Sequence, residues 1–167
     1  MIDDAERNEG IAKVRELIEG IEIAMLTTLR SDGSLHSRPM ETQRTEFDGD
    51  LWFFTAASSH KVDEVNQDRH VNVSFADPGK QHYVSLSGTA QLVRDREKID
   101  QLWNPALRAW FPDGVDDPDL ALLKISVESA EYWDAPASMV AFTIGLAKAL
   151  ITGEAHDPSE HATVDLK

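Results

Sequence analysis

Residues 71–93 read VNVSFADPGKQHYVSLSGTAQLV and contain two strand patterns joined by a turn signal. Apolar and polar residues alternate over 71–75, which is typical of a strand with one buried face. Pro78-Gly79 then turns the chain, and residues 82–93 continue as a second, longer strand. Gly88 interrupts this second strand and indicates a bulge or a bend there. The stretch therefore predicts an antiparallel pair of strands.

The segments on either side of this pair also predict strands joined by tight turns. The turn signals Asp32-Gly33 and Asp48-Gly49 separate three strand patterns on the N-terminal side. There is no alternation of strand, helix and strand, so a parallel sheet of the Rossmann kind is not expected. The fold class predicted is mainly β, an antiparallel barrel with peripheral helices. The further strands are expected over 21–29, 35–43, 51–55, 122–127 and 130–134.

Helices are expected at the edges of this barrel. Gly20 is a plausible stop for the first, Ser58 or Ser59 caps the second, and Asp95 caps the third. We expect one domain over residues 1–153, followed by a polar, loose tail over 154–167. The four predicted helices span 4–19, 60–66, 95–103 and 137–152.

The charge of the chain limits its partners. The 167 residues include 30 acidic and 16 basic side chains, which gives a net charge of −14. Nucleic acid and anionic membranes are poor partners for such a chain, because both require a basic face. Residues 1–112 hold 19 acids and 13 bases, against 11 and 3 in residues 113–167. An anion site is therefore expected in the first two thirds of the chain.

The sequence contains no cysteine, which excludes disulfides, thiolate nucleophiles and cysteine-ligated metal centres. The N-terminal MIDDAERNEG lacks the basic start and apolar run of a secretory signal. The longest apolar stretch, Met139–Ile151, is shorter than the roughly 20 residues of a membrane span. The expected location is the cytoplasm.

Three hydroxyls and a lysine occur where a strand ends and a helix begins, in Thr55-Ala56-Ala57-Ser58-Ser59-His60-Lys61. A helix N-terminus presents free N–H groups and partial positive charge, to which hydroxyls add donors and lysine adds full charge. This combination predicts a phosphate site, although a simple serine cap with an exposed lysine is the plainer alternative.

Arg38 stands beside aliphatic residues in Ser37-Arg38-Pro39-Met40. An arginine in a strand is often explained by an anion or a carboxylate that its guanidinium binds. Pro39 removes a ladder donor and indicates an edge strand or a bulge, so a surface arginine on an edge strand is the alternative. Arg38 and Lys61 together point to one dianion.

Aromatic residues could bracket a planar ligand, but packing explains any single one equally well. The tryptophans are Trp52, Trp103, Trp110 and Trp133. The histidines show no metal-ligand spacing, and neither a nucleophile elbow nor a catalytic triad order is present. If the protein performs chemistry, a cofactor must therefore supply the reactive group.

The chain resembles the general stress protein branch of the pyridoxamine 5′-phosphate oxidase-like FMN-binding split-barrel family. The resemblance covers about residues 10–135 and keeps the order of its segments. They are MLTTLRSDGSLHSRPM, LWFFTAASSHKVDEV, VNVSFAD, YVSLSGTAQLVRD and WNPALRAWFPDGVDDPDLALLKISVESAEYWD. The resemblance implies a split β-barrel that pairs as a homodimer, with FMN at the subunit interface.

The resemblance also implies the site residues. Arg38 and Lys61 would hold the FMN phosphate, with hydrogen bonds from Thr55 and from Ser58 or Ser59. Other residues would lie along the flavin: Pro39, Met40 and Phe54 on the isoalloxazine and ribityl chain, Trp133 from the second subunit, and more weakly Trp110, Tyr83 and Ser85.

One departure from the family concerns the substrate. In the true oxidase, a tryptophan is followed by an Arg-x-His segment that holds the pyridoxal group, whereas Trp133 is followed here by DAPASMVAFTIGLAK. No arginine occurs after Arg108 and no histidine between Trp133 and His156. Pyridoxamine phosphate oxidation is therefore not expected.

The sequence is consistent with two hypotheses about the function. The first is a flavin-dependent oxidoreductase of unknown substrate. The second is a non-catalytic module that binds or buffers a flavin or a related cofactor in a stress response. Haem and F420 are disfavoured as that cofactor, and a purely structural protein is disfavoured by the pair Arg38 and Lys61.

Overall fold

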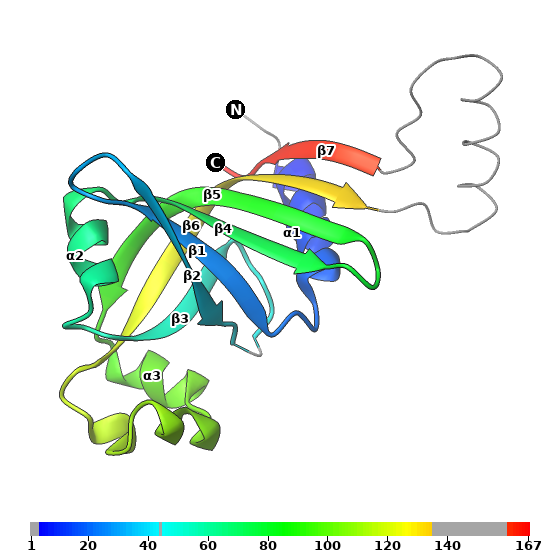
Figure 1. The fold of residues 1–167 in the computed structure, drawn as a ribbon. Coiled ribbons are helices and arrows are strands. Elements are labelled where there is room, and N and C mark those ends of the chain that lie inside the picture. The colour runs from blue at the N-terminus through cyan, green and yellow to red at the C-terminus, as the bar shows by residue number, and fades with distance from the viewer. Residues whose placement is uncertain (1–3, 44, 135–159) are drawn as a thin grey trace, which may run out of the picture.

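The computed structural model describes residues 4–43, 45–134 and 160–167. Within these ranges, seven strands form one antiparallel sheet in the order β2-β1-β4-β5-β6-β3, with β7 paired to β6. The two ends of this path, β2 and β3, contact each other but share no strand pairing among the described residues. The sheet therefore curls into a barrel that stays open along one seam, which is a split barrel (Figure 1). The strands are β1 Ile23–Leu29, β2 Leu35–Glu41, β3 Asp50–Ala56, β4 His70–Asp77, β5 His82–Val93, β6 Leu120–Asp134 and β7 Glu160–Asp165.

In the described part of the chain, three α-helices lie around the sheet. Helix α1 (Asp4–Ile18) lies against the sheet, and α2 (His60–Gln67) packs beside β1 and β5. Helix α3 (Arg96–Leu102) and two short 3₁₀ helices, η1 (Pro105–Ala109) and η2 (Gly114–Asp116), form a lobe below the barrel (Figure 1). No helix among the described residues is long and apolar enough to cross a membrane.

The apolar side chains of the described residues form two separate clusters. The larger one fills the barrel and includes Val14 and Leu17 of α1 together with residues of most strands. The smaller one lies under α3 and is built around Phe54, Ile99 and Leu122. Side chains of β3 divide between the two, because Phe53 faces the barrel interior while Phe54 faces the lobe.

Several sequence predictions are confirmed. Gly20 and Gly33 adopt positive φ angles where a helix stop and a hairpin turn were expected. The pairing of β5 with β6 shifts register between Ser87 and Gly88, as the glycine indicated. β2 is an edge strand, which accommodates Pro39 without the loss of a ladder bond to a second neighbour. Asp95 caps α3 by accepting from the backbone N–H groups of Glu97 and Lys98.

Two predictions are wrong. The strands expected over 122–127 and 130–134 are one continuous strand, β6, because β5 pairs with it from Leu122 to Trp133, on both sides of the bulge. Part of the loose tail expected over 154–167 is ordered, because 160–165 form β7. Alternate residues there, Ala162 and Val164, pack on the main core, and Leu166 is buried. The predicted helix 137–152 lies outside the described residues.

Candidate functional site

Lys61 lies in the first turn of α2, where its ammonium group meets two hydroxyls. Its Nζ donates to Oγ1 of Thr55 at 3.3 Å and to Oγ of Ser59 at 3.2 Å. The two hydroxyl oxygens are themselves 3.3 Å apart. Ser59 holds the N-cap position of α2, but its side chain makes no cap hydrogen bond. The serine hydroxyl thus belongs to a cluster at the β3–α2 junction rather than to the helix cap.

Arg38 projects from β2 toward the same region, where one terminal nitrogen of its guanidinium, Nη2, has three hydrogen-bond partners. Its Nη2 lies 2.8 Å from Oγ1 of Thr28, 2.8 Å from Nδ1 of His36 and 2.6 Å from Oε2 of Glu64. The side chains of Arg38 and Glu64 are only 14% and 13% exposed, so this ion pair is largely shielded from water.

The other edge of the same guanidinium has no partner. Nη1 of Arg38 is the one buried side-chain nitrogen or oxygen in the described part of the chain that makes no hydrogen bond. Buried donors are nearly always satisfied, and leaving one unpaired costs free energy. An unpaired guanidinium nitrogen inside a protein therefore indicates the place of an anionic or acceptor ligand.

The surroundings of these cations are polar and buried. Thr28 and Thr55 are the two fully buried polar residues of the described chain, and each contacts one of the two cations. Burial, and then the positive charge of Arg38, lower the pKa of the Lys61 amine despite the opposing effect of Glu64. The two positive charges are thus close enough to repel each other, and a bound anion would relieve this repulsion.

Glu64 is held as a carboxylate within this network. Burial alone would raise its pKa, but the hydrogen bond from Thr28 and the charge and hydrogen bond of Arg38 outweigh burial. The pKa of Glu64 therefore lies below its ordinary value, and the carboxylate is ionised at neutral pH.

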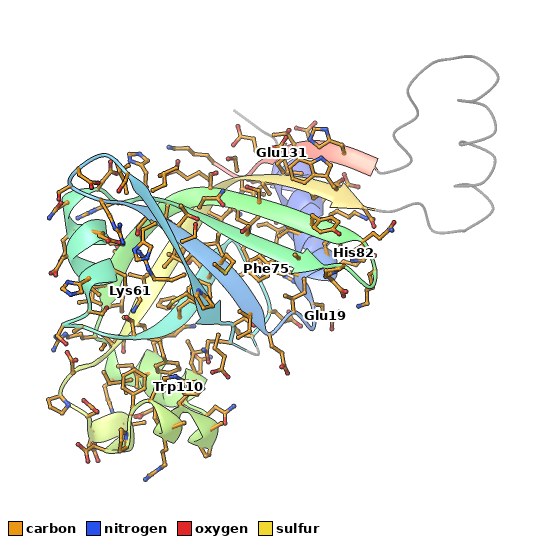
Figure 2. All side chains as sticks on the ribbon, in the orientation of Figure 1. Glu19, Lys61, Phe75, His82, Trp110 and Glu131 are labelled. Atoms are coloured by element: carbon orange, nitrogen blue, oxygen red, sulfur yellow. The ribbon has the colours of Figure 1, made fainter. Side chains whose placement is uncertain are left out.

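The sheet register brings these side chains together. Leu26 pairs with Arg38 and Thr28 pairs with His36 in the β1–β2 ladder, so Thr28, His36 and Arg38 share the inner face. Lys61 and Glu64 stand three residues apart on α2 and therefore on one side of that helix. α2 packs against β1, which places both side chains over the network (Figure 2 labels Lys61 beside α2).

We call Arg38, Thr55, Ser59 and Lys61 the cradle. The structure brings these four predicted residues together, whereas Ser58 points elsewhere. Its N–H and its hydroxyl donate to the two carboxylate oxygens of Asp119, at 2.9 and 2.6 Å. These bonds lower the pKa of Asp119 and tie the β3–α2 turn to the loop before β6.

The residues predicted to line the flavin lie in three different environments. Met40 is buried in the main core. Phe54 is buried in the smaller cluster, edge-on to Trp103 with ring centroids 5.8 Å apart. Pro39 faces the outside of the sheet, where it pairs with Met25 of β1. The contact of these three side chains with a flavin stays a prediction.

The remaining predicted residues lie away from the cradle. Tyr83 pairs with Trp133, and Ser85 pairs with Glu131, on the outer face of β5 and β6. Trp110 follows η1 in the lobe and is 66% exposed. Figure 2 shows Lys61 at one end of the barrel, Trp110 below it, and Glu131 toward the other end.

Sequence reasoning missed Thr28, His36 and Glu64. A signal existed for each one. His36 precedes Arg38 by two residues, which puts both on one face of a strand. Glu64 follows Lys61 by three residues on a helix, and Thr28 continues the inward alternation of Ala24 and Leu26. No group of three or more metal-ligating side chains occurs in the described residues.

Known proteins resemble this chain over most of its length. The family model for pyridoxamine 5′-phosphate oxidase-like proteins matches residues 9–157. Protein bli-3 of Neurospora crassa is 34% identical over 143 residues, covering 80% of this chain and 68% of the relative. General stress protein 26 of Bacillus subtilis is 30% identical over 132 residues, which cover 74% of this chain and 87% of that relative.

Solved structures support the same relationship. A general stress protein 26 from Jannaschia sp. CCS1 superposes with a TM-score of 0.75 at 30% identity, covering 95% of this chain and 99% of that one. A protein from Xanthomonas citri named as a general stress FMN/FAD binding protein gives a TM-score of 0.67 at 31% identity. The match covers 79% of this chain and 93% of that one.

Proposed function

The chain belongs to the pyridoxamine 5′-phosphate oxidase-like family, and we propose that it is a general stress protein that binds FMN through its phosphate. One observation carries the proposal: the unpaired, buried Nη1 of Arg38 lies in the same network as the Lys61 ammonium. The relative from Xanthomonas citri is named for binding FMN or FAD, which supports a flavin as the ligand.

The cradle fits a phosphate monoester. Such a group carries close to two negative charges at neutral pH and offers several acceptor oxygens. Arg38 and Lys61 supply two positive charges, and Thr55 and Ser59 supply hydroxyl donors. The N–H groups of His60 and Lys61, at the start of α2, have no carbonyl partner within the helix and can add further donors. The donors therefore suit the oxygens of a phosphate, and the positive charge that remains after Glu64 offsets one cation favours an anion.

The aromatic residues support a site shared by two subunits. Thr55 pairs with Ala121, and Trp133 follows twelve positions later on the same strand. At the rise of a strand this is about 40 Å of chain, which is more than one mononucleotide spans. Lys61 and Glu131, a neighbour of Trp133 on β6, also lie toward opposite ends of the barrel in Figure 2, which favours a site in which the cradle and Trp133 come from different chains. We propose a homodimer in which each cradle faces the Trp133 region of the partner.

The exposed apolar residues support the same assembly. Met25 and Tyr83 lie on the outer face of the sheet and are 39% and 41% exposed, and Ile23 is 53% exposed. Large exposed apolar groups on one face are typical of an interaction surface. A two-fold axis would place this face against itself and close two equivalent sites.

When bound, FMN supplies an isoalloxazine ring that accepts a hydride or electrons. The chain would then act as a flavin-dependent oxidoreductase, with the cradle anchoring the phosphate and the partner covering the ring. Its substrate is unassigned. Pyridoxamine phosphate is not proposed, because the Arg-x-His segment is missing after Trp133. The location in the cytoplasm stays a prediction of the sequence.

Spectroscopy of the purified protein tests this proposal. We expect flavin absorbance bands that persist through gel filtration, or their appearance when FMN is added. Anaerobic bleaching of these bands by NADH or NADPH would support turnover, and stable bands would favour a binding or buffering role. A protein that binds no FMN at micromolar concentrations would overturn the proposal.

A further inference from the structure

The ion pair between Arg38 and Glu64 is itself held by other groups. Thr28 donates to Oε2 of Glu64 at 2.5 Å, and that same oxygen accepts from Nη2 of Arg38. On the other carboxylate oxygen, Arg30 Nε lies at 3.5 Å and His36 Nδ1 at 3.7 Å. Glu64 is therefore a fixed anchor rather than a mobile surface carboxylate.

The contacts of Arg38 are unevenly distributed over its two terminal nitrogens. Within the described residues, the three hydrogen-bond partners of the guanidinium, namely Thr28, His36 and Glu64, all lie on Nη2. Nη1 is buried and has none. A planar guanidinium held along one edge cannot rotate about its axis without losing those bonds, so its free edge has a defined direction.

We propose that Glu64 is a positioning residue for phosphate recognition: it holds Nη2 of Arg38 so that Nη1 is directed to the ligand phosphate. The inference rests on the proposed function, since it concerns how the same cradle binds. Holding the side chain in place before binding removes part of the ordering cost that a free arginine would pay.

The sign of the effect separates this role from simple electrostatics. A carboxylate near a phosphate repels it, so removal of the Glu64 charge should tighten binding if charge alone matters. If Glu64 acts by positioning, removal of its oxygen atoms should weaken binding although a negative charge is lost. Glutamine keeps an acceptor oxygen without the charge, and alanine keeps neither.

The experiment compares Glu64→Ala and Glu64→Gln, with FMN and riboflavin as probes in fluorescence titrations. Riboflavin lacks the phosphate but keeps the flavin ring. For FMN we expect the dissociation constant of Glu64→Ala to rise roughly three- to tenfold, and that of Glu64→Gln to stay within about twofold. For riboflavin we expect both variants to match the wild type.

A double-mutant cycle gives a second readout. Because Glu64 acts through Arg38, Glu64→Ala should cause no further loss of FMN affinity in an Arg38→Ala background. If Glu64→Ala fails to fold, Thr28→Val replaces it. This near-isosteric change removes the hydroxyl that bridges Arg38 and Glu64, and it should weaken FMN but not riboflavin.

Three outcomes would overturn the inference. Tighter FMN binding by both Glu64 variants would make Glu64 a competing charge. Equal losses for FMN and riboflavin would make its role merely structural. A loss that persists in the Arg38→Ala background would mean that it acts through another group. Absence of FMN binding by the wild type would instead remove the proposed function and this inference with it.

Discussion

The indole ring of Trp133 lies almost parallel to the imidazole ring of His161, with centroids 5.0 Å apart and planes 7° apart. Tyr83 pairs with Trp133 on the opposite side, so three rings follow one another across β5, β6 and β7. Nε2 of His161 also lies 2.7 Å from Oε1 of Glu131. β7 thus completes an aromatic row on the sheet face that we assign to the dimer interface.

We expect Trp133→Ala to weaken both dimerisation and FMN retention. Burial of a large aromatic side chain contributes roughly 1.5–3 kcal/mol, and the proposed interface contains one copy from each subunit. Light scattering combined with flavin absorbance measures both effects on one sample. A monomeric variant that keeps stoichiometric FMN would contradict the interface model while leaving the cradle intact.

Trp52→Ala is the matched control for that variant. Trp52 packs against the smaller core cluster and lies beneath Lys98 Nζ at 4.7 Å and Lys124 Nζ at 5.5 Å from the ring centroid. Its loss should lower the free energy of unfolding without changing the oligomeric state or FMN retention.

Arg38→Ala and Lys61→Ala should each weaken FMN binding at least about tenfold. A hydrogen bond to a charged group is worth roughly 1.5–3 kcal/mol, and each variant removes one such donor from the proposed phosphate site. FMN fluorescence quenching gives the affinities, with Lys80→Ala as a control on an exposed lysine. Unchanged affinity in both cradle variants would mean that the phosphate binds elsewhere.

The two adjacent serines should behave differently. The hydroxyl of Ser59 lies in the cradle, whereas that of Ser58 is bound to Asp119. Ser59→Ala should therefore raise the FMN dissociation constant about two- to tenfold, the value of one neutral hydrogen bond. Ser58→Ala should leave it unchanged and slightly lower thermal stability. Weaker FMN binding by Ser58→Ala, with no change for Ser59→Ala, would mean that Ser58 rather than Ser59 contacts the phosphate.

The fold was predictable from local signals that the structure retains. Alternation and tight turns define β1 to β5, and Gly33 and Gly88 stand where the chain turns and bulges. β7 was missed because its apolar residues Ala162 and Val164, with Leu166 just after the strand, alternate with charged and polar ones in a short segment. Its pairing with β6 and its packing on the core identify this alternation as a strand.

The cradle was predictable in part, because the chemistry of hydroxyls and cations is visible in the sequence. The choice between Ser58 and Ser59 was not predictable. It depends on the hydrogen bond of Ser58 to Asp119, which lies 61 residues away in the chain. Glu64 was missed for a similar reason. Its role depends on Arg38, 26 residues earlier on a strand that sequence alone does not place beside α2.

Gly88→Ala should lower the free energy of unfolding by about 1–3 kcal/mol. A Cβ atom at Gly88 would lie 2.1 Å from the backbone oxygen of Ser126, and backbone atoms of a paired strand cannot move aside cheaply. Denaturant unfolding measures the change, with Ser87→Ala as a control at the exposed neighbouring position. Wild-type stability of the glycine variant would mean that the β5–β6 bulge adapts freely.

Lys61→Met should raise the melting temperature of the flavin-free protein near neutral pH. Burial, followed by the charge of Arg38, lowers the pKa of Lys61 from the ordinary value of 10.5. The unfolded chain then holds the proton more tightly than the folded chain, so the charged amine reduces stability at neutral pH. This penalty vanishes as the pH rises past both pKa values. The gain from Lys61→Met should accordingly shrink as the pH rises toward the ordinary value of 10.5 and be absent above it, and Lys80→Met should show no such gain. Thermal unfolding of flavin-free protein between neutral and alkaline pH checks this. A lower melting temperature for Lys61→Met at neutral pH would show that the bonds of its amine to Thr55 and Ser59 outweigh the cost of burying its charge.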